Sequence, residues 1–250
     1  MKIAVCVKQV PDTETKVRIS DDQKSIDEQN INFILNPYDE FAIEEGIKTK
    51  ETHGGEVTII SLGPDRVTAA IRNALAMGGD KAIHIKTGSD PADPLVVADA
   101  LSQVLREGHY DIIFLGKQAI DDDNAQVAPI LSEMLGIPAV SVVTELTVTA
   151  GHISAQRQIE GGFEKVEADM PVIISTQRGL NKPRFASLKG IMAAKKITIE
   201  ERTVPLGNDQ IEITELNYPP QKPPGKIVGE GPEAVPELLR LLREEAKVLS

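Results

Sequence analysis

Short apolar runs alternate with amphipathic helical segments over the first half of the 250-residue chain. The runs occupy residues 3–7, 57–62, 82–85 and 111–115, and helical patterns begin near residues 36, 67, 95 and 125. Strands that alternate with helices at such short spacing pair in parallel through right-handed crossovers, and helices then cover both faces of the sheet. The sequence therefore predicts an α/β fold, a Rossmann-like parallel sheet flanked by helices.

The pattern changes after residue 138. Residues 139–149 and 153–159 are rich in β-branched side chains, and a Glu-Gly-Gly turn at 160–162 precedes a further extended segment, 164–168. This arrangement predicts a β-hairpin. Residues 171–176 then predict one more buried strand, and 179–191 are expected to form a loop.

The last fifty residues have a different composition. Residues 203–226 contain several prolines and few large apolar side chains, which predicts an extended arm. Residues 232–249 have the apolar spacing of an amphipathic helix, whose apolar stripe needs a partner surface. We expect a nucleotide-binding domain at 1–200 and, at 201–250, an arm and helix that pack on this domain or on a partner chain.

The segment 115–127 is expected to contain the end of a strand, an acidic loop and the start of a helix. Ligands of parallel sheets lie at the carboxyl ends of the strands, where loop amides and a helix N-terminus can hold a phosphate. The loop is therefore a candidate nucleotide site. Its three consecutive aspartates, Asp121 to Asp123, also permit a metal site, but no second acidic cluster follows another strand. A solvated turn that caps the helix is the remaining interpretation.

Composition excludes several classes of function. A net charge of -11 and an aromatic content of 3% argue against nucleic-acid binding, which needs a basic surface or stacking aromatic rings. No apolar run is long enough to cross a membrane, so an integral membrane protein is not expected. The single cysteine, Cys6, is expected to be a small core residue, and its lack of a disulfide partner in the chain is compatible with the cytoplasm.

Catalytic motifs are weak. Residues 229–234 match G-x-G-x-x-A, but too few residues follow for a returning strand. There is no phosphate-binding P-loop, the four histidines lack ligand spacing, and no Ser-His-Asp set can be assigned. We therefore predict no catalytic residue and no metal ligand.

Several motifs resemble one known family. The loop 116–123 (GKQAIDDD), together with Gln126, is similar to the nucleotide-binding loop of electron transfer flavoprotein beta subunits. The segment 155–164 (AQRQIEGGFE) is similar to the signature of that family, and residues 7–12, 36–38, 61–64 and 180–188 match it in order. The resemblance covers residues 1 to about 200.

The resemblance implies an electron carrier and not an enzyme. Members of the family are heterodimers that relay electrons from dehydrogenases, such as acyl-CoA dehydrogenases, to a quinone oxidoreductase or another acceptor. The alpha subunit holds most of the redox-active FAD. The beta subunit binds AMP in the simple type and a second FAD in the electron-bifurcating type, which oxidises NADH.

The resemblance also implies site residues. The nucleotide would lie among Cys6, Asn36, Leu62, Gly116, Asp122, Ala125, Gln126 and Val127. Tyr38 matches an aromatic residue near the alpha-subunit flavin. Leu188 matches the hydrophobic anchor that docks into dehydrogenases, on a loop that spans 180–190.

One difference and one similarity bear on the nucleotide. Bifurcating members have a loop closer to D-G-D-T-A-Q-V, with glycine at the position of Asp122. A carboxylate fills space and opposes a second phosphate group, so Asp122 favours AMP. In contrast, the Ala-Gln-Val run at 125–127 is more similar to the bifurcating loop. Three hypotheses stay open: a simple carrier subunit, a bifurcating subunit with its own FAD, and a stand-alone regulator that binds adenine nucleotides.

Overall fold

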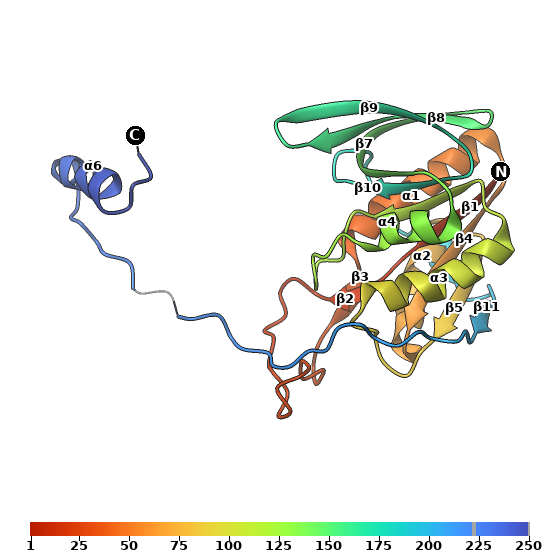
Figure 1. Cartoon of the computed structure of the whole chain (residues 1–250), viewed down its shortest axis with the longest axis horizontal. Coiled ribbons are helices and arrows are strands. Elements are labelled where there is room, and N and C mark those ends of the chain that lie inside the picture. Colours follow the sequence, from red (N-terminus) through yellow and green to blue (C-terminus); the bar gives the residue numbers. More distant parts are fainter. Residues whose placement is uncertain (222–223, 250) are drawn as a thin grey trace.

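A sheet of strands in the order β11-β5-β4-β1-β6-β10-β7-β8-β9 forms the centre of the structure (Figure 1). The computed structural model describes residues 1–221 and 224–249. The strands that pair only in parallel are β1 (Lys2–Cys6), β4 (Glu56–Gly63), β5 (Lys81–Lys86), β6 (Ile112–Gly116), β10 (Val172–Thr176) and β11 (Ile199–Arg202). The predicted α/β class with a largely parallel sheet is confirmed.

Helices cover both faces of this sheet (Figure 1). They are α1 (Pro37–His53), α2 (Thr68–Met77), α3 (Pro94–Gly108) and α4 (Val127–Leu135). In β1, Ile3 and Val5 pack in the core cluster of α1 and α2, whereas Ala4 and Cys6 pack in the cluster of α3 and α4. Successive side chains of a strand point to opposite faces. Burial on both faces therefore explains why the run 3–7 is apolar throughout.

The predicted hairpin is present and is part of a three-stranded meander. The strands are β7 (Ala139–Thr149), β8 (His152–Ile159) and β9 (Gly162–Asp169). β8 pairs antiparallel with both of its neighbours, while β7 pairs parallel with β10, so the meander extends the main sheet at one edge. A second small sheet pairs β2 (Gln9–Pro11) with β3 (Phe33–Leu35).

The prediction of a loop over 179–191 was wrong for its last residues. Helix α5 (Leu188–Ala194) begins there, with the side chain of Ser187 accepting a hydrogen bond from the N–H of Gly190 at 3.0 Å. Glycine disfavours a helix, but position 190 has no room for a side chain. A Cβ atom there would lie 2.3 Å from the carbonyl oxygen of Ala76. Glycine is therefore needed for the close packing of α5 on α2.

The C-terminal segment leaves the body as an arm. Beyond β11 it first follows the body: the Gln210 N–H donates to Asp93, and the Tyr218 hydroxyl accepts from the N–H of Ile19. Helix α6 (Val235–Glu244), preceded by the turn η2 (Pro232–Ala234), lies away from the sheet (Figure 1). Lys222 and Pro223 of the predicted arm, and Ser250, lie outside the described residues.

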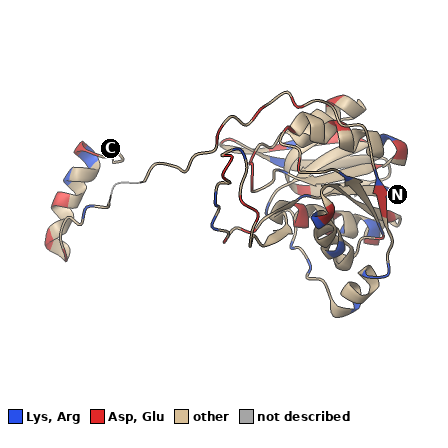
Figure 2. Cartoon of the chain, turned by 90° about the horizontal axis from the view of Figure 1, so that it is seen from below, with Lys and Arg blue, Asp and Glu red and all other residues tan. Residues whose placement is uncertain are grey.

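The predicted C-terminal helix is shorter than its apolar pattern suggested. α6 ends at Glu244, and Lys247 has a left-handed φ of 53°, which stops helical continuation before residue 249. The domain boundary at residue 200 stays a prediction, and β11 spans that position. Charged residues of both signs are distributed over the body and over α6 (Figure 2).

Candidate nucleotide-binding site

A pocket opens at the carboxyl ends of β1, β4 and β6. The chain places β4 and β5 on one side of β1, and then returns to place β6 on the other side. At such a reversal the loops after adjacent strands diverge and leave a crevice, which is where parallel sheets bind ligands. The topology therefore creates the pocket, which is lined by the loops that leave β1, β5 (Lys81–Lys86) and β6 and by the end of β4.

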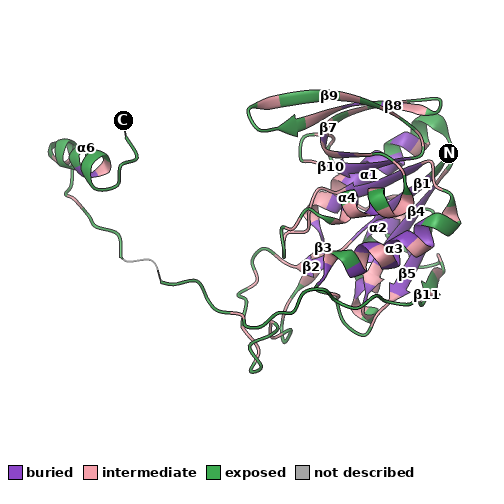
Figure 3. Cartoon of the chain, viewed as in Figure 1, coloured by how far each residue is buried: buried purple, intermediate pink, exposed green. Residues whose placement is uncertain are grey.

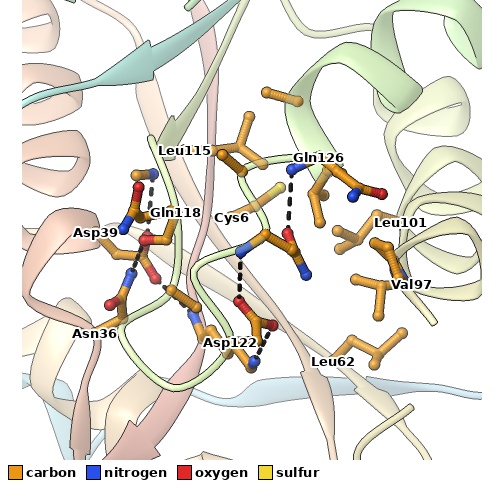
Figure 4. A pocket seen from close by; sticks show the side chains of 18 of the residues that line it. Cys6, Asn36, Asp39, Leu62, Val97, Leu101, Leu115, Gln118, Asp122 and Gln126 are labelled. Carbon is orange, nitrogen blue, oxygen red and sulfur yellow. Dashed lines mark hydrogen bonds and ion pairs between the residues drawn. The ribbon is translucent and has the colours of Figure 1, made fainter. Parts of the chain in front are cut away.

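All eight residues that the sequence assigned to the nucleotide line this one pocket (Figure 4). They come from four separate parts of the chain: Cys6, Asn36, Leu62, and the group Gly116, Asp122, Ala125, Gln126 and Val127. The fold thus brings the predicted set together. Their role in binding a nucleotide stays a prediction.

One wall of the pocket is apolar. Leu62 belongs to β4, and Val97 and Leu101 project from α3 (Figure 4). Sequence reasoning singled out Leu62 but not the two residues of α3, because their helical spacing predicts core packing equally well. An apolar wall beside converging polar groups suits a flat aromatic ligand with a polar tail.

The opposite wall is the acidic loop between β6 and α4. The carboxylate of Asp122 accepts a hydrogen bond from the N–H of Asn124 at 3.3 Å, and the Asn124 side chain accepts from the N–H of Gln126 at 3.1 Å (Figure 4). Val127 then begins α4. The first N–H groups of a helix lack intrahelical acceptors and attract anions. This end of the pocket is therefore suited to a phosphate.

Asn36 occupies the cap position of α1, but its side chain does not cap the helix. Its side-chain amide donates to the carbonyl oxygen of Gln118 at 2.9 Å and accepts from the N–H of Ile120 at 3.3 Å (Figure 4). Asn36 therefore joins the start of α1 to the acidic loop. Proline at the first helical position supports the helix start without a side-chain cap.

Asp39 is a buried acidic residue at the pocket, and the sequence did not assign it to the site. It accepts from the backbone N–H of Lys8 at 2.7 Å and from that of Gly116 at 3.0 Å. Burial raises the pKa of Asp39 to about 7, although these donors favour its charged form. Burial, together with the nearby Asp39, raises the pKa of the Cys6 thiol as well, so Cys6 is a protonated, unreactive thiol at neutral pH.

Lys8 is a second pocket residue that sequence reasoning did not single out. Its ammonium donates to Asp121 at 2.9 Å and to Asp122 at 3.0 Å. Burial of the ammonium lowers its pKa, but the two carboxylates outweigh this effect and raise it. The signal in the sequence is positional, since Lys8 closely follows the end of the first strand.

The other two predicted residues lie outside this pocket. Tyr38 is the second residue of α1, and the ammonium of Lys117 lies 4.9 Å from the centre of its ring. Leu188 is the first residue of α5 and is 79% exposed, so it stands on a helix start and not within a loop. Nearby Phe185, which the sequence did not single out, is 98% exposed.

Two contacts join the exposed segment 184–188 to α1. The guanidinium of Arg184 binds Glu44 at 2.8 Å and Glu51 at 2.6 Å. Glu44 is buried and Glu51 is exposed. Because Tyr38 and Asp39 lie at the other end of the same helix, α1 connects the exposed segment to the pocket through rigid structure.

Comparison with known proteins matches residues 23–206 to the family described as "Electron transfer flavoprotein domain". The chain belongs to the electron transfer flavoprotein family. It is 39% identical to "Electron transfer flavoprotein subunit beta" of Bacillus subtilis (strain 168), with all of both chains covered. It is 36% identical to the mitochondrial beta subunit of Arabidopsis thaliana, again over the whole of both chains. The beta subunit of Syntrophomonas wolfei is 37% identical, with 93% of this chain and 92% of that one covered.

The family assignment accounts for the motifs that the sequence resemblance used. Both the acidic loop and the segment 155–164 lie inside the matched residues 23–206. In the described part of the chain, no three His, Cys, Asp or Glu side chains gather into a metal site. No helix among the described residues combines the length and the apolar character needed to cross a membrane.

Proposed function

We propose that this chain is the beta subunit of a heterodimeric electron carrier that binds AMP in the pocket at the ends of β1, β4 and β6. The observation that carries the proposal is the convergence of all eight expected nucleotide residues on one pocket in a chain of this family. The alpha subunit would hold the redox-active FAD. The dimer would relay electrons from acyl-CoA dehydrogenases or related dehydrogenases to a quinone oxidoreductase or another acceptor.

The residues of the pocket fit AMP. Leu62, Val97 and Leu101 offer an apolar wall for the adenine base, and the N-terminal end of α4 is suited to the phosphate. AMP would supply no redox chemistry there. Its role would be structural, because a ligand that binds only the folded chain stabilises the loops that it joins.

Asp122 supports AMP over a second FAD. Its carboxylate already accepts the Asn124 N–H and lines the pocket, so a ligand with a second phosphate would meet a negative charge in addition to reduced space. A bifurcating subunit with its own FAD, able to oxidise NADH, is the alternative that nucleotide analysis would reveal.

The flavin side of the chain is proposed to include Tyr38. Its ring lies at the start of α1, and Lys117 places a positive charge beside it. An aromatic ring can pack against a flavin ring system, and a nearby cation favours a flavin that gains negative charge on reduction. The flavin itself would accept and return the electrons.

The segment 184–188 is proposed to dock into the dehydrogenase. Leu188 and Phe185 present apolar side chains to solvent, and Arg184 fixes the base of the segment on α1. Exposed apolar groups on a firmly held segment are typical of a protein interaction site. We assign Leu188 as the anchor.

Helix α6 is proposed to dock on the alpha subunit. Val235, Leu238 and Leu239 are between 40% and 48% exposed, and among the described elements α6 packs substantially only on η2 (Figure 3). An isolated ten-residue helix is marginal in water without a surface for its apolar face. The partner subunit is the surface that a heterodimeric carrier provides. The cytoplasm, which is compatible with Cys6 as a free cysteine, is the compartment that we propose.

Co-expression with the alpha subunit tests the assembly. We expect a one-to-one complex that contains flavin, and we expect the double variant Leu238→Asp/Leu239→Asp to weaken it strongly. Glu244→Gln, on the same helix, is the matched control and should leave the complex intact. A stable homodimer that binds ATP without any alpha subunit would instead identify a stand-alone regulator.

A further inference from the structure

Lys8 is held at both of its ends beside the candidate pocket. Its backbone N–H donates to the buried carboxylate of Asp39 at 2.7 Å, and its ammonium donates to Asp121 and Asp122 at 2.9 and 3.0 Å. Lys8 follows β1, whereas the two aspartates belong to the loop after β6. One side chain therefore joins the segments that follow two neighbouring strands.

The contact with Lys8 offsets part of the negative charge of the acidic loop. Three consecutive carboxylates, Asp121 to Asp123, would repel a phosphate at the start of α4. The Lys8 ammonium contacts two of them, and Lys8 is one of the residues that line the pocket. The lining of the pocket thus contains Lys8 and, against its ammonium, the carboxylate of Asp122, while Lys117 is a second lysine of the lining.

Lys8 also orients the turn that leads into α4. One oxygen of Asp122 accepts from the Lys8 ammonium, and its other oxygen accepts from the N–H of Asn124. The turn contains two residues with left-handed backbone, Asp123 at φ 50° and Ala125 at φ 54°. Such conformations are unfavourable for residues with a side chain and need neighbouring contacts to hold them.

We propose that Lys8 determines the specificity of this pocket for nucleoside monophosphates, by pairing with one phosphate group while it holds Asp121 and Asp122 as a negative wall against a second one. The inference rests on the proposed AMP site and adds the residue that selects the length of the phosphate chain. It predicts that Lys8 affects the phosphate of a ligand and not its nucleoside.

The test is calorimetric titration of the full chain with adenosine, AMP and ADP, for the unmodified protein and for Lys8→Met. Methionine keeps the length and apolar character of the lysine stem but removes its charge. We expect the AMP affinity to fall by about tenfold to a hundredfold, as for the loss of a charge-assisted hydrogen bond, and the adenosine affinity to change less than about twofold. Lys24→Met is the matched control, because Lys24 pairs with Glu212 outside the pocket.

A second set of variants isolates the negative wall. Asp121→Asn/Asp122→Asn should raise the affinity for ADP relative to AMP by about fivefold or more, because it removes two negative charges beside Lys8, of which Asp122 lines the pocket. Adding Lys8→Met to this pair should leave an AMP affinity above that of Lys8→Met alone.

Failure of the Lys8 inference is distinguishable from failure of the nucleotide site. If the unmodified chain binds AMP but Lys8→Met binds it equally well, or loses adenosine and AMP affinity in equal proportion, then Lys8 is not the selective residue. If the unmodified chain binds neither adenosine nor AMP, the proposed nucleotide site fails, and the inference about Lys8 fails with it.

Discussion

The Oδ1 atom of Asp39 accepts a hydrogen bond of 3.0 Å from the backbone N–H of Gly116. A Cβ atom on residue 116 would lie 2.3 Å from this same oxygen, so the two residues fit only because residue 116 is glycine. The contact joins the first turn of α1 to the end of β6, directly beneath the pocket. It fixes where the acidic loop begins.

Gly116→Ala should therefore displace the acidic loop. The new methyl group would overlap Asp39 and the backbone of Tyr38, and relief of such overlap in packed structure costs about 1–3 kcal/mol. We expect a lower free energy of unfolding in urea and a loss of AMP binding. Gly162→Ala is the matched control, because an added Cβ there meets no atom within 4 Å. Equal stability of the two variants would contradict the packing argument.

Asp39 should make the stability of the chain depend on pH. Its pKa rises from 3.8 in the unfolded chain to about 7 in the folded one because of burial. Below pH 3.8 the carboxyl group is protonated in both states. As pH rises towards 7, only the unfolded carboxyl ionises, so the folded state loses up to about 4 kcal/mol of relative stability.

Asp39→Asn measures this effect, because an amide does not titrate. The free energy of unfolding of the original chain, minus that of the variant, should fall as pH rises from 3.8 to about 7. The difference cancels the contributions of ionisable groups that both chains share. Glu40 is one of these groups, because burial raises its pKa as well. A difference that is constant across this range would show that folding does not raise the pKa of Asp39.

Arg184→Lys should loosen the proposed docking segment. Lysine keeps the charge but loses the planar fork that binds Glu44 and Glu51 together, and it leaves the buried Glu44 poorly paired. We expect a loss of about 1–2 kcal/mol in unfolding free energy and slower electron transfer from the dehydrogenase. Arg202→Lys, which changes a surface pair with Glu200 and Glu107, should have little effect on either measurement.

Leu188→Ala should slow electron transfer from the dehydrogenase and leave the nucleotide content unchanged. The side chain is exposed on α5 and is absent from the pocket lining, so its removal costs contact area only in a docked complex. Val17→Ala, which removes a different exposed apolar side chain, is the control. An unchanged rate at limiting carrier concentration would remove Leu188 as the anchor.

The sequence predicts the sheet well because its strands are buried on both faces. Continuous apolar runs such as 3–7 and 112–115 are typical of strands in that position, and the turns between them are marked by glycine and proline. The start of α5 could not be predicted in the same way. Gly190 indicates a helix break, and only its contact with Ala76 shows that glycine serves packing instead.

Part of the pocket could also be predicted from a local sequence pattern. The acidic loop is recognisable because a strand, a polar turn and a helix start follow one another in the sequence. Lys8 and Asp39 could not be assigned, since their partners lie many positions away: Lys8 meets Asp121 across 113 positions and Asp39 meets Gly116 across 77. Contacts of this kind depend on the order of strands in the sheet, which the local pattern does not specify.

The identity of the bound nucleotides tests the proposed function most directly. The heterodimer that we propose for this chain and an alpha subunit would be purified and denatured, and the released nucleotides would be separated and quantified. We expect one FAD and one AMP per heterodimer. Two FAD and no AMP would contradict the proposal, because they would show that Asp122 and the wall held by Lys8 admit a dinucleotide.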